Sequence, residues 1–290
     1  MSAVGRAELR AAVRDATGRL AGAGVASPQV DARLLAEHLL GRPLVLADSA
    51  PAGFVESYCM LVERRANREP LQHVLGRMWF RGLELVSRPG VFIVRPETEV
   101  VAGAAIDAVR ACASTGQAPG RPLVVDLCTG SGASAAAVAD EVPGTRVLAV
   151  ELDDVAARLA ADNCARLVPG RVEVLQADAT DPATLGALDG MVDVVVSNPP
   201  YVPDGEVEDI ETARHDPDLA LFGGGADGLV VPRAVVTRAA ALLAPGGHLV
   251  MEHDAGQGAA LREAAREAGF VRAQTGSDLT GRDRYLLARR

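Results

Sequence analysis

The chain changes its hydrophobic pattern at about residue 97. After that point, short apolar runs of strand length alternate with longer stretches in which apolar residues recur at helical spacing. Such alternation is typical of parallel strands joined by helices. It predicts an α/β fold with a doubly wound, mostly parallel, seven-stranded sheet. We expect strands near 123–127, 146–150, 172–178, 191–197, 247–252, 271–275 and 285–288, and helices at 133–140, 154–167, 229–244 and 257–269.

The first 67 residues show helical spacing instead. Leu9, Val13 and Leu20 recur on one helical face. Ser27 followed by Pro28 is typical of a helix start, because serine favours the N-cap and proline the first helical position. We therefore expect a small N-terminal helical domain.

Between these parts, residues 78–86 alternate well enough to form a strand, and residues 91–94 are its expected hairpin partner. A helix is expected over 97–111, and a loop over 114–121, where glycine, proline and small residues gather. These expectations divide the chain into a helical domain at 1–75, a β-hairpin linker at 76–96 and the α/β domain at 97–290.

Composition limits the function. The 290 residues are 49% hydrophobic, which is enough for an α/β core and a small second domain. The 29 basic residues are all arginine. Residues 1–99 carry 13 of them against 11 acidic residues, whereas residues 100–290 carry 16 against 27. This acidic α/β part argues against a large nucleic-acid surface and tolerates a cationic cofactor.

The four cysteines, at positions 59, 112, 128 and 164, are widely spaced, so a disulfide framework or a metal site is not expected. The start of the chain does not resemble a signal peptide, and no apolar run reaches 18 residues. We therefore expect a cytoplasmic protein with no membrane span.

The segment Asn198-Pro199-Pro200-Tyr201 follows the apolar run at 191–197. Ligands of open α/β sheets bind beyond the carboxyl ends of the strands. The two prolines stiffen this turn and remove two backbone donors. The turn can then present the Asn198 amide oxygen, the Pro199 carbonyl and the Tyr201 ring together. Two acceptors and an aromatic face suit a planar group that carries an NH2.

A second turn, Thr129-Gly130-Ser131-Gly132, follows the strand at 123–127. Its glycines allow close approach of backbone to a ligand, and the next helix offers free N–H groups. Three acids accompany successive strand ends: Asp126, Glu151 and Asp178. Asp126 would repel a pyrophosphate but suits a ligand with an ammonium group and a sulfonium. Glu151 suits the ribose hydroxyls of an adenosine, and Asp178 the adenine amino group.

These motifs together resemble class I S-adenosylmethionine-dependent methyltransferases. The narrower resemblance is to the protein-(glutamine-N5) methyltransferases of the HemK/PrmC type. It is carried by Asp126-x-Cys128-Thr129-Gly130-Ser131-Gly132, Glu151, Asn198-Pro199-Pro200-Tyr201, Arg95-Pro96-Glu97-Thr98-Glu99, Ala226-Asp227-Gly228 and Leu249-Val250-Met251-Glu252-His253. It covers nearly the whole chain and is weakest before residue 69.

The resemblance implies a Rossmann-like methyltransferase domain whose last strand is antiparallel and inserted beside its neighbours. It implies S-adenosyl-L-methionine as the cofactor, held by Asp126, Cys128, Thr129, Gly130, Ser131, Gly132, Glu151, Asp178, Ala179 and Asn198. It implies catalysis and substrate binding at Asn198, Pro199, Pro200 and Tyr201. The expected protein substrate is a glutamine in the Gly-Gly-Gln loop of a peptide-chain release factor, held by the helical domain. Arg95 and Glu97 either contact a substrate loop or join the domains.

Two positions depart from the family pattern. Cys128 stands where the family usually has glycine, which limits how closely the turn approaches the cofactor unless the φ angle there is negative. Ala179 stands where a large aromatic residue is common, so the adenine pocket is expected to be looser. The pair Glu252-His253 at the end of a strand is either a base or a structural pair.

The sequence does not exclude three other functions. An exocyclic NH2 of a nucleic-acid base meets the same acceptors once the base is flipped out. A ribosomal protein glutamine is an alternative protein target. A binding module without catalysis is a further reading, against which the intact Asn-Pro-Pro-Tyr motif argues.

Overall fold

The computed structural model describes residues 4–114, 120–205, 207 and 209–290. Most of the loop predicted at 114–121 lies outside these residues. The described chain forms two units. The helical unit contains described residues of 1–78, 87–89 and 208–215, and the α/β unit contains those of 79–86, 90–207 and 216–290. The predicted boundaries run along the chain, whereas both units are discontinuous.

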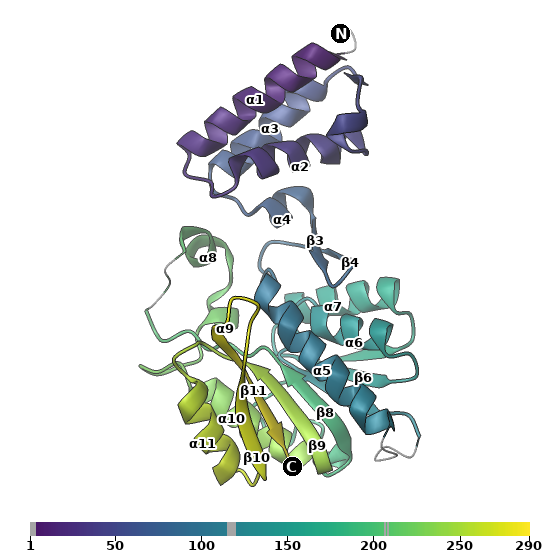
Figure 1. The fold of residues 1–290 in the computed structure, drawn as a ribbon, viewed down its shortest axis with the longest axis vertical. Helices are drawn as coiled ribbons and strands as arrows, with labels where there is room; N and C mark the ends of the chain where they lie inside the picture. The colour runs from purple at the N-terminus through teal and green to yellow at the C-terminus, as the bar shows by residue number, and fades with distance from the viewer. Residues whose placement is uncertain (1–3, 115–119, 206, 208) are drawn as a thin grey trace. The chain divides into compact units, whose positions relative to one another are not determined.

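The helical unit is built on long helices that share one apolar core, as the residue pattern predicts (Figure 1). Leu20, Leu35 and Tyr58 are fully buried there, and the Tyr58 hydroxyl donates to the Ala32 carbonyl at 2.8 Å. The elements are α1 (Arg6–Gly22), α2 (Pro28–Leu40), α3 (Phe54–Ala66), α4 (Leu71–Leu75), η1 (Leu44–Leu46), β1 (Val4–Gly5) and β2 (Ser49–Ala50). Helix α2 begins at Pro28, as predicted from the Ser-Pro pair.

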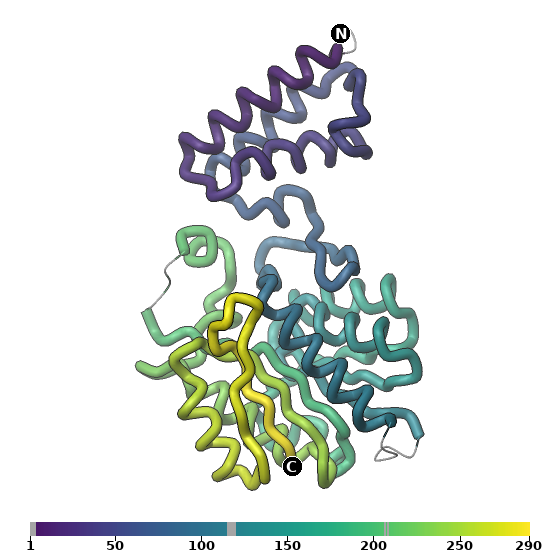
Figure 2. The backbone as a smooth tube through the Cα atoms, in the orientation of Figure 1, coloured from purple at the N-terminus to yellow at the C-terminus, as the bar shows by residue number. Residues whose placement is uncertain are grey.

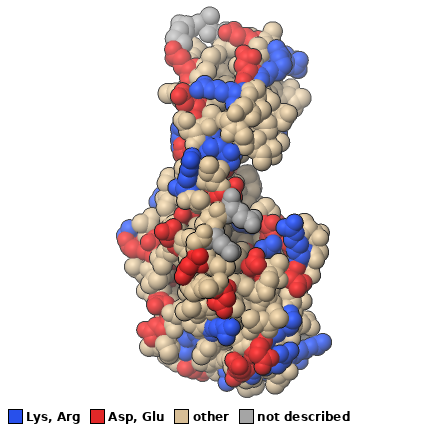
Figure 3. Space-filling model, turned by 90° about the vertical axis from the view of Figure 1, so that its left-hand side faces the viewer, with Lys and Arg blue, Asp and Glu red and all other residues tan. Residues whose placement is uncertain are grey.

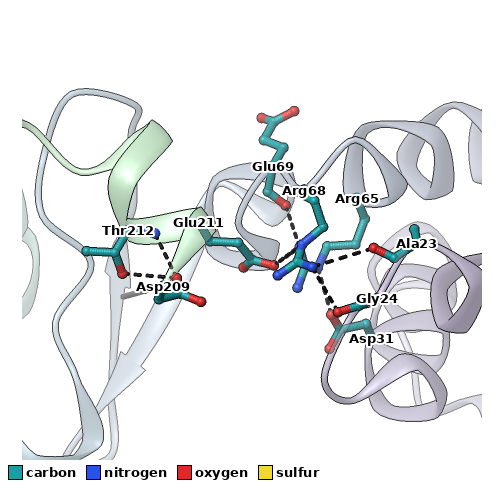
Figure 4. Close-up of polar contacts among 9 residues, drawn as sticks. All are labelled: Ala23, Gly24, Asp31, Arg65, Arg68, Glu69, Asp209, Glu211 and Thr212. Carbon is teal, nitrogen blue, oxygen red and sulfur yellow. Dashed lines mark hydrogen bonds and ion pairs between the residues drawn. The ribbon is translucent and has the colours of Figure 1, made fainter. Parts of the chain in front are cut away.

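A late segment of the chain joins this unit. Helix α8 (Ile210–His215) supplies Glu211, whose Oε1 accepts from Arg65 Nη1 at 2.8 Å and from Arg68 Nε at 2.7 Å. Arg65 Nε also donates to Asp31 at 2.7 Å (Figure 4). The Arg65 side chain is only 7% exposed, so its charge is stabilised by two carboxylates. We call these four side chains the Arg65 cluster.

The α/β unit is built on a seven-stranded sheet within the described residues, in the order β10-β11-β9-β8-β5-β6-β7. All neighbouring pairs from β9 to β7 are parallel, and β11 is antiparallel to both β9 and β10. The prediction of an inserted antiparallel last strand is therefore confirmed (Figure 2, yellow end of the chain). The strands are β5 (Leu123–Leu127), β6 (Arg146–Glu151), β7 (Val172–Gln176), β8 (Val192–Ser197), β9 (Leu243–Glu252), β10 (Arg272–Ser277) and β11 (Asp283–Arg289).

The alternation of apolar residues along the strands creates two cores, one on each face of the sheet. In β5, Val124 joins the core formed with helices α5, α6 and α7, whereas Val125 and Leu127 join the core formed with α10 and α11. This two-sided burial explains why the strands read as continuous apolar runs. The helices are α5 (Pro96–Ser114), α6 (Ala133–Glu141), α7 (Asp154–Leu167), α10 (Val230–Leu242) and α11 (Gly258–Glu267), with short α9 (Asp218–Leu221) and η2 (Gly186–Leu188).

The predicted hairpin between residues 78–86 and 91–94 is wrong. The paired strands are β3 (Arg77–Phe80) and β4 (Leu83–Val86), and residues 91–94 form no strand. The chain reverses at Arg81 and Gly82, where φ is +46° and +82°. Two consecutive positive φ angles are what a two-residue hairpin turn requires. The stretch read as one strand is therefore the whole hairpin.

Candidate functional site

Four neighbouring parallel strands, β8, β5, β6 and β7, end at one cavity of about 280 Å³ in the α/β unit. Its wall includes apolar side chains such as Val91, Phe92 and Leu152. The predicted site residues that line it are Cys128, Gly130, Glu151, Asp178, Ala179, Asn198, Pro199, Pro200 and Tyr201. Residues predicted from separate motifs therefore meet at the carboxyl edge of the sheet, where such folds bind ligands.

Asp126 lies beneath the glycine turn and is buried. Its Oδ2 accepts from the Thr129 hydroxyl at 2.5 Å and from the Ala135 backbone nitrogen at 3.1 Å. Burial raises the pKa of Asp126 to about 7, although these hydrogen bonds oppose the rise. The contacts seen for Asp126 thus brace the turn and the first residues of α6. Direct contact with a cofactor ammonium group stays a prediction.

The turn itself has left-handed backbone at Cys128, Gly130 and Gly132, with φ of +63°, +58° and +82°. Cys128 is therefore held in a conformation that favours glycine. A Cβ at Gly132 would lie 3.2 Å from the Ala160 backbone in α7, which explains the small residue there. Ser131, like Thr129, is buried within this region and does not line the cavity. These residues shape the turn from behind.

Glu151 joins the second strand end to this turn. Its Oε2 accepts from the Gly130 nitrogen at 2.8 Å, and its Oε1 accepts from the nitrogens of Leu152 and Asp153 at 2.9 and 3.0 Å. Burial raises its pKa above the ordinary value, and the three backbone donors oppose that rise. The carboxylate lines the cavity in an orientation fixed by these three donors, and its contact with ribose hydroxyls stays a prediction.

At the third strand end, Asp178 and Ala179 line the same cavity. The Asp178 Oδ1 accepts from the backbone nitrogen and the hydroxyl of Thr180 at 2.8 and 2.6 Å. Ala179 is buried, and its methyl group leaves room where a larger side chain would fill the cavity. Binding of adenine at these two residues stays a prediction.

The Asn-Pro-Pro-Tyr turn after β8 rests on glycine backbone. A Cβ at Gly228 would lie 2.2 Å from the Tyr201 carbonyl oxygen, and one at Gly223 would lie 2.8 Å from the Pro200 oxygen. Gln257 Nε2 donates to the Tyr201 carbonyl at 2.8 Å. Among the described residues, no donor reaches the Pro199 carbonyl. The turn is thus held from behind, while one carbonyl stays available to a ligand.

Arg95 and Glu97 do not line the cavity. Arg95 pairs with Asp216 at 2.5 Å, and its guanidinium lies 5.0 Å from the centre of the Phe92 ring. Because Phe92 lines the cavity, Arg95 supports the wall through this ring. A direct role of Arg95 or Glu97 in substrate binding stays a prediction.

Two buried residues make contacts with the turn that the sequence did not predict. Thr98 accepts from Asn198 Nδ2 at 3.4 Å, and Glu252 accepts from the Tyr201 hydroxyl at 3.2 Å. Both are 1% exposed. Their signal was present, since Thr98 lies in the Arg-Pro-Glu-Thr-Glu segment and Glu252 ends a strand, but the chain alone gives no partner for either. His253 is fully buried with Nδ1 2.6 Å from the Asp254 carbonyl, and it does not line the cavity.

Two further findings concern the described part of the chain. Within it, no three histidine, cysteine or acidic side chains gather in a way that could hold a metal ion. No helix among the described residues is long and apolar enough to cross a membrane.

The fold and the cavity define a class I S-adenosylmethionine-dependent methyltransferase. Residues 11–76 match the family described as PrmC N-terminal domain, and residues 124–215 match a methyltransferase domain family. A methyltransferase from Pyrococcus furiosus has the same fold, with a TM-score of 0.52 and 19% identity over 72% of this chain and 89% of that one.

Curated relatives narrow the assignment. The chain is 43% identical to the release factor glutamine methyltransferase of Bifidobacterium longum over 95% of this chain and 97% of that protein. It is 47% identical to the protein of the same name from Streptomyces coelicolor over 97% of this chain and 98% of that one. The chain therefore belongs to the release factor glutamine methyltransferase family.

S-adenosylmethionine is the cofactor of this class, and the cavity fits it. Carboxylates at Glu151 and Asp178 suit ribose hydroxyls and an adenine amino group, while Leu152 and Ala179 offer apolar walls. The acidic character of these strand ends also suits a cation. The donor and acceptor set of the cavity therefore agrees with an adenosine that carries a sulfonium.

Proposed function

We propose that this protein methylates the side-chain amide nitrogen (N5) of a glutamine in the Gly-Gly-Gln loop of a peptide-chain release factor. The observation that carries the proposal is the Asn198–Tyr201 turn in the wall of the cofactor cavity. It combines an amide oxygen, an available carbonyl and an aromatic ring, which together match a primary amide. The names of the curated relatives support the same substrate.

Positioning is the main task of this site. An amide nitrogen is a weak nucleophile, because its lone pair is delocalised into the carbonyl. Asn198 Oδ1 and the Pro199 carbonyl each accept one N–H of the substrate amide, and Tyr201 packs on its plane. This arrangement points the nitrogen at the transferable methyl group and stabilises the positive charge that develops on it.

The reaction balances without a dedicated base. The bound cofactor supplies a methyl group on a positively charged sulfur, which is a good leaving group. A nitrogen–carbon bond forms as the carbon–sulfur bond breaks, and the methylated amide then loses one proton to water. The residues of this chain hold the donor at Glu151, Asp178 and the Gly130 turn, and they keep the acceptors of the Asn198 turn in place.

The proposed partner is a protein, which the helical unit is expected to help bind. A release factor acts in translation, so we propose a cytoplasmic site of action. A glutamine in a ribosomal protein presents the same amide group and is the alternative within the family.

A nucleic-acid base with an exocyclic NH2 is the alternative outside the family. Such a substrate requires a broad basic surface. On the face drawn in Figure 3, acidic and basic side chains are interspersed over the α/β unit. The excess of acidic residues after position 99 counts in the same direction. These features favour the protein substrate.

Labelling tests the proposal. The purified protein with methyl-labelled S-adenosylmethionine should label an unmodified release factor at one glutamine, which mass spectrometry locates. Release factor whose Gly-Gly-Gln glutamine is changed to alanine should take no label. Continued labelling of that variant, or labelling of nucleic acid in a cell extract, would overturn the proposed substrate.

A further inference from the structure

The register of the sheet brings Glu252 beside the catalytic turn. Strands β8 and β9 are parallel neighbours, with Ser197 opposite Met251. The residues that follow, Asn198 and Glu252, therefore leave the same sheet edge side by side. Helix α5 packs on both strands, and Thr98 lies in its first turn. Three segments far apart in sequence thus meet behind the Asn-Pro-Pro-Tyr turn.

The contacts of Thr98 bear on the orientation of Asn198. Thr98 Oγ1 accepts from Asn198 Nδ2 at 3.4 Å. A side-chain amide has its donors on nitrogen and its acceptor on oxygen. If the nitrogen is directed at Thr98, the oxygen is turned away from it and toward the cavity that Asn198 lines. An amide flipped by 180° would instead direct an NH2 at the substrate NH2, and the two donors would repel.

Glu252 restrains the other side chain of the turn. Its Oε1 accepts from the Tyr201 hydroxyl at 3.2 Å, and Oε2 has no hydrogen-bond partner among the described residues. Burial of a carboxylate with one bare oxygen costs free energy. Because of this cost, we attribute the buried Glu252 carboxylate to the function of the site and not to the stability of the core.

We propose that Thr98 and Glu252 are positioning residues for methyl transfer, with Thr98 selecting the orientation of the Asn198 amide and Glu252 fixing the Tyr201 ring. Neither residue lines the cavity, so each acts through its partner in the turn. The proposal rests on the proposed function of that turn.

The charge of Glu252 links the two contacts. Its surroundings include Thr98 and Glu97 on α5, Tyr201 after β8 and Arg284 on β11. Burial raises the pKa of Glu252 to about 7; the Thr98 and Tyr201 hydroxyls and Arg284 oppose this rise, and Glu97 adds to it. The ionised carboxylate can only accept, and its Oε2, which has no other partner among the described residues, is open to the hydroxyl hydrogen of Thr98. The lone pairs of Thr98 are then free to face the amide nitrogen of Asn198.

Thr98→Val tests whether Thr98 selects the orientation of the Asn198 amide, because valine keeps the shape of threonine and removes the hydroxyl. We expect kcat for methylation of the release factor to fall by roughly tenfold or more, with the cofactor Kd unchanged within about twofold. Thr98→Ser restores the hydroxyl and should recover most of the rate. Thr145→Val is the matched control, since Thr145 is also fully buried but lies before β6, at the opposite edge of the sheet.

A double-mutant cycle separates positioning from general damage. In an Asn198→Ala background, Thr98→Val should cause no further loss of rate, because the group on which Thr98 acts is gone. Independent losses in the two variants would overturn the role of Thr98. If the parent enzyme labels the release factor normally and kcat is unchanged in Thr98→Val, the positioning role of Thr98 is rejected. The proposed function is then unaffected. A parent that labels no release factor rejects the proposed function itself.

The cofactor-bound protein provides a readout that does not depend on activity. The Asn198 side-chain NH2 protons should exchange with water more slowly in the parent than in Thr98→Val, as seen by NMR. Equal exchange would show that Thr98 does not hold the amide.

The positioning role of Glu252 is tested by the pH profile of kcat. We expect the parent rate to rise through about pH 7 as Glu252 ionises, and Glu252→Gln to lower the rate and remove this limb. Tyr201→Phe, which keeps the ring and removes the hydroxyl, should make the rate insensitive to Glu252→Gln when it is combined with Thr98→Val, because both hydroxyl partners of Glu252 are then gone. A limb that persists in Glu252→Gln would overturn the role of Glu252.

Discussion

The carboxylate of Glu151 holds the backbone of Gly130, with 2.8 Å between Glu151 Oε2 and the Gly130 nitrogen. The end of β6 is thereby tied to the turn after β5. One side chain can shape the turn and also face the ligand, so its removal should affect cofactor binding through both contacts.

Glu151→Ala should weaken binding of S-adenosylmethionine by about 1–3 kcal/mol, the range for loss of a charged hydrogen-bond partner. Isothermal titration calorimetry measures this change. Glu173→Ala is the control, because Glu173 lies on β7 with its side chain 64% exposed. An unchanged dissociation constant for Glu151→Ala would show that the ribose does not bind there.

Asn198→Ala should leave cofactor affinity and folding near normal while the transfer rate falls by about 10²-fold, because a positioning acceptor is lost. Single-turnover labelling of the release factor gives the rate, and calorimetry gives the affinity. If affinity and rate fall by the same factor, Asn198 belongs to the cofactor pocket. A parental rate would reduce it to a structural cap.

Stability should depend on pH through two buried acids. Burial raises the pKa of Asp126 from 3.8 to about 7, and that of Glu252 from 4.5 to about 7. A raised pKa in the folded state stabilises the fold at low pH, and this contribution is lost as the pH rises through about 7. The free energy of unfolding in urea should therefore decrease from about pH 5 to about pH 8. Glu252→Gln should flatten this slope, and a slope equally steep in that variant would contradict the assignment.

Cys128 should tolerate glycine better than a β-branched residue, because its φ of +63° lies in the left-handed region. We expect Cys128→Val to lower the free energy of unfolding by about 1–3 kcal/mol and Cys128→Gly to change it by less than about 1 kcal/mol. Cys59→Val, on an exposed position of α3, is the control. Equal effects at both cysteines would show that the backbone at Cys128 is not strained.

Glu211→Gln should destabilise the helical unit by about 1–3 kcal/mol, since it leaves the buried Arg65 with one carboxylate in place of two. Urea unfolding followed by far-UV circular dichroism measures the change. Glu63→Gln removes an exposed partner of Arg19 and should change stability by no more than about 0.5 kcal/mol. A loss as small in Glu211→Gln would show that the Arg65 cluster contributes little.

Sequence reasoning succeeded where local pattern decides the structure. The apolar runs gave the strands, and their carboxyl ends brought Glu151 and Asn198 to one cavity, because parallel strands share an edge. It failed at the hairpin, where Gly82 marked a turn inside an otherwise alternating stretch. It did not predict the contact between Thr98 and Asn198, because a hydrogen bond between residues 100 positions apart leaves no periodic signal.

Helix α8 shows the same limit on a larger scale. Its sequence neighbours belong to the α/β unit, and the methyltransferase family match includes it, yet Glu211 contacts Arg65 and Arg68 in the helical unit. The sequence of residues 210–215 does not indicate whether Glu211 contacts these arginines or solvent. Only tertiary contacts assign the segment.

Because α8 belongs to the helical unit, that unit can be completed only late in the synthesis of the chain. Glu211 lies 146 positions after Arg65, so a ribosome has produced nearly three quarters of the chain before the Arg65 cluster can close. Until then, Arg65 has Asp31 as its carboxylate partner in the cluster. The first part of the chain to emerge is therefore among the last to be completed, and an N-terminal segment alone would lack the contacts of Glu211 with Arg65 and Arg68.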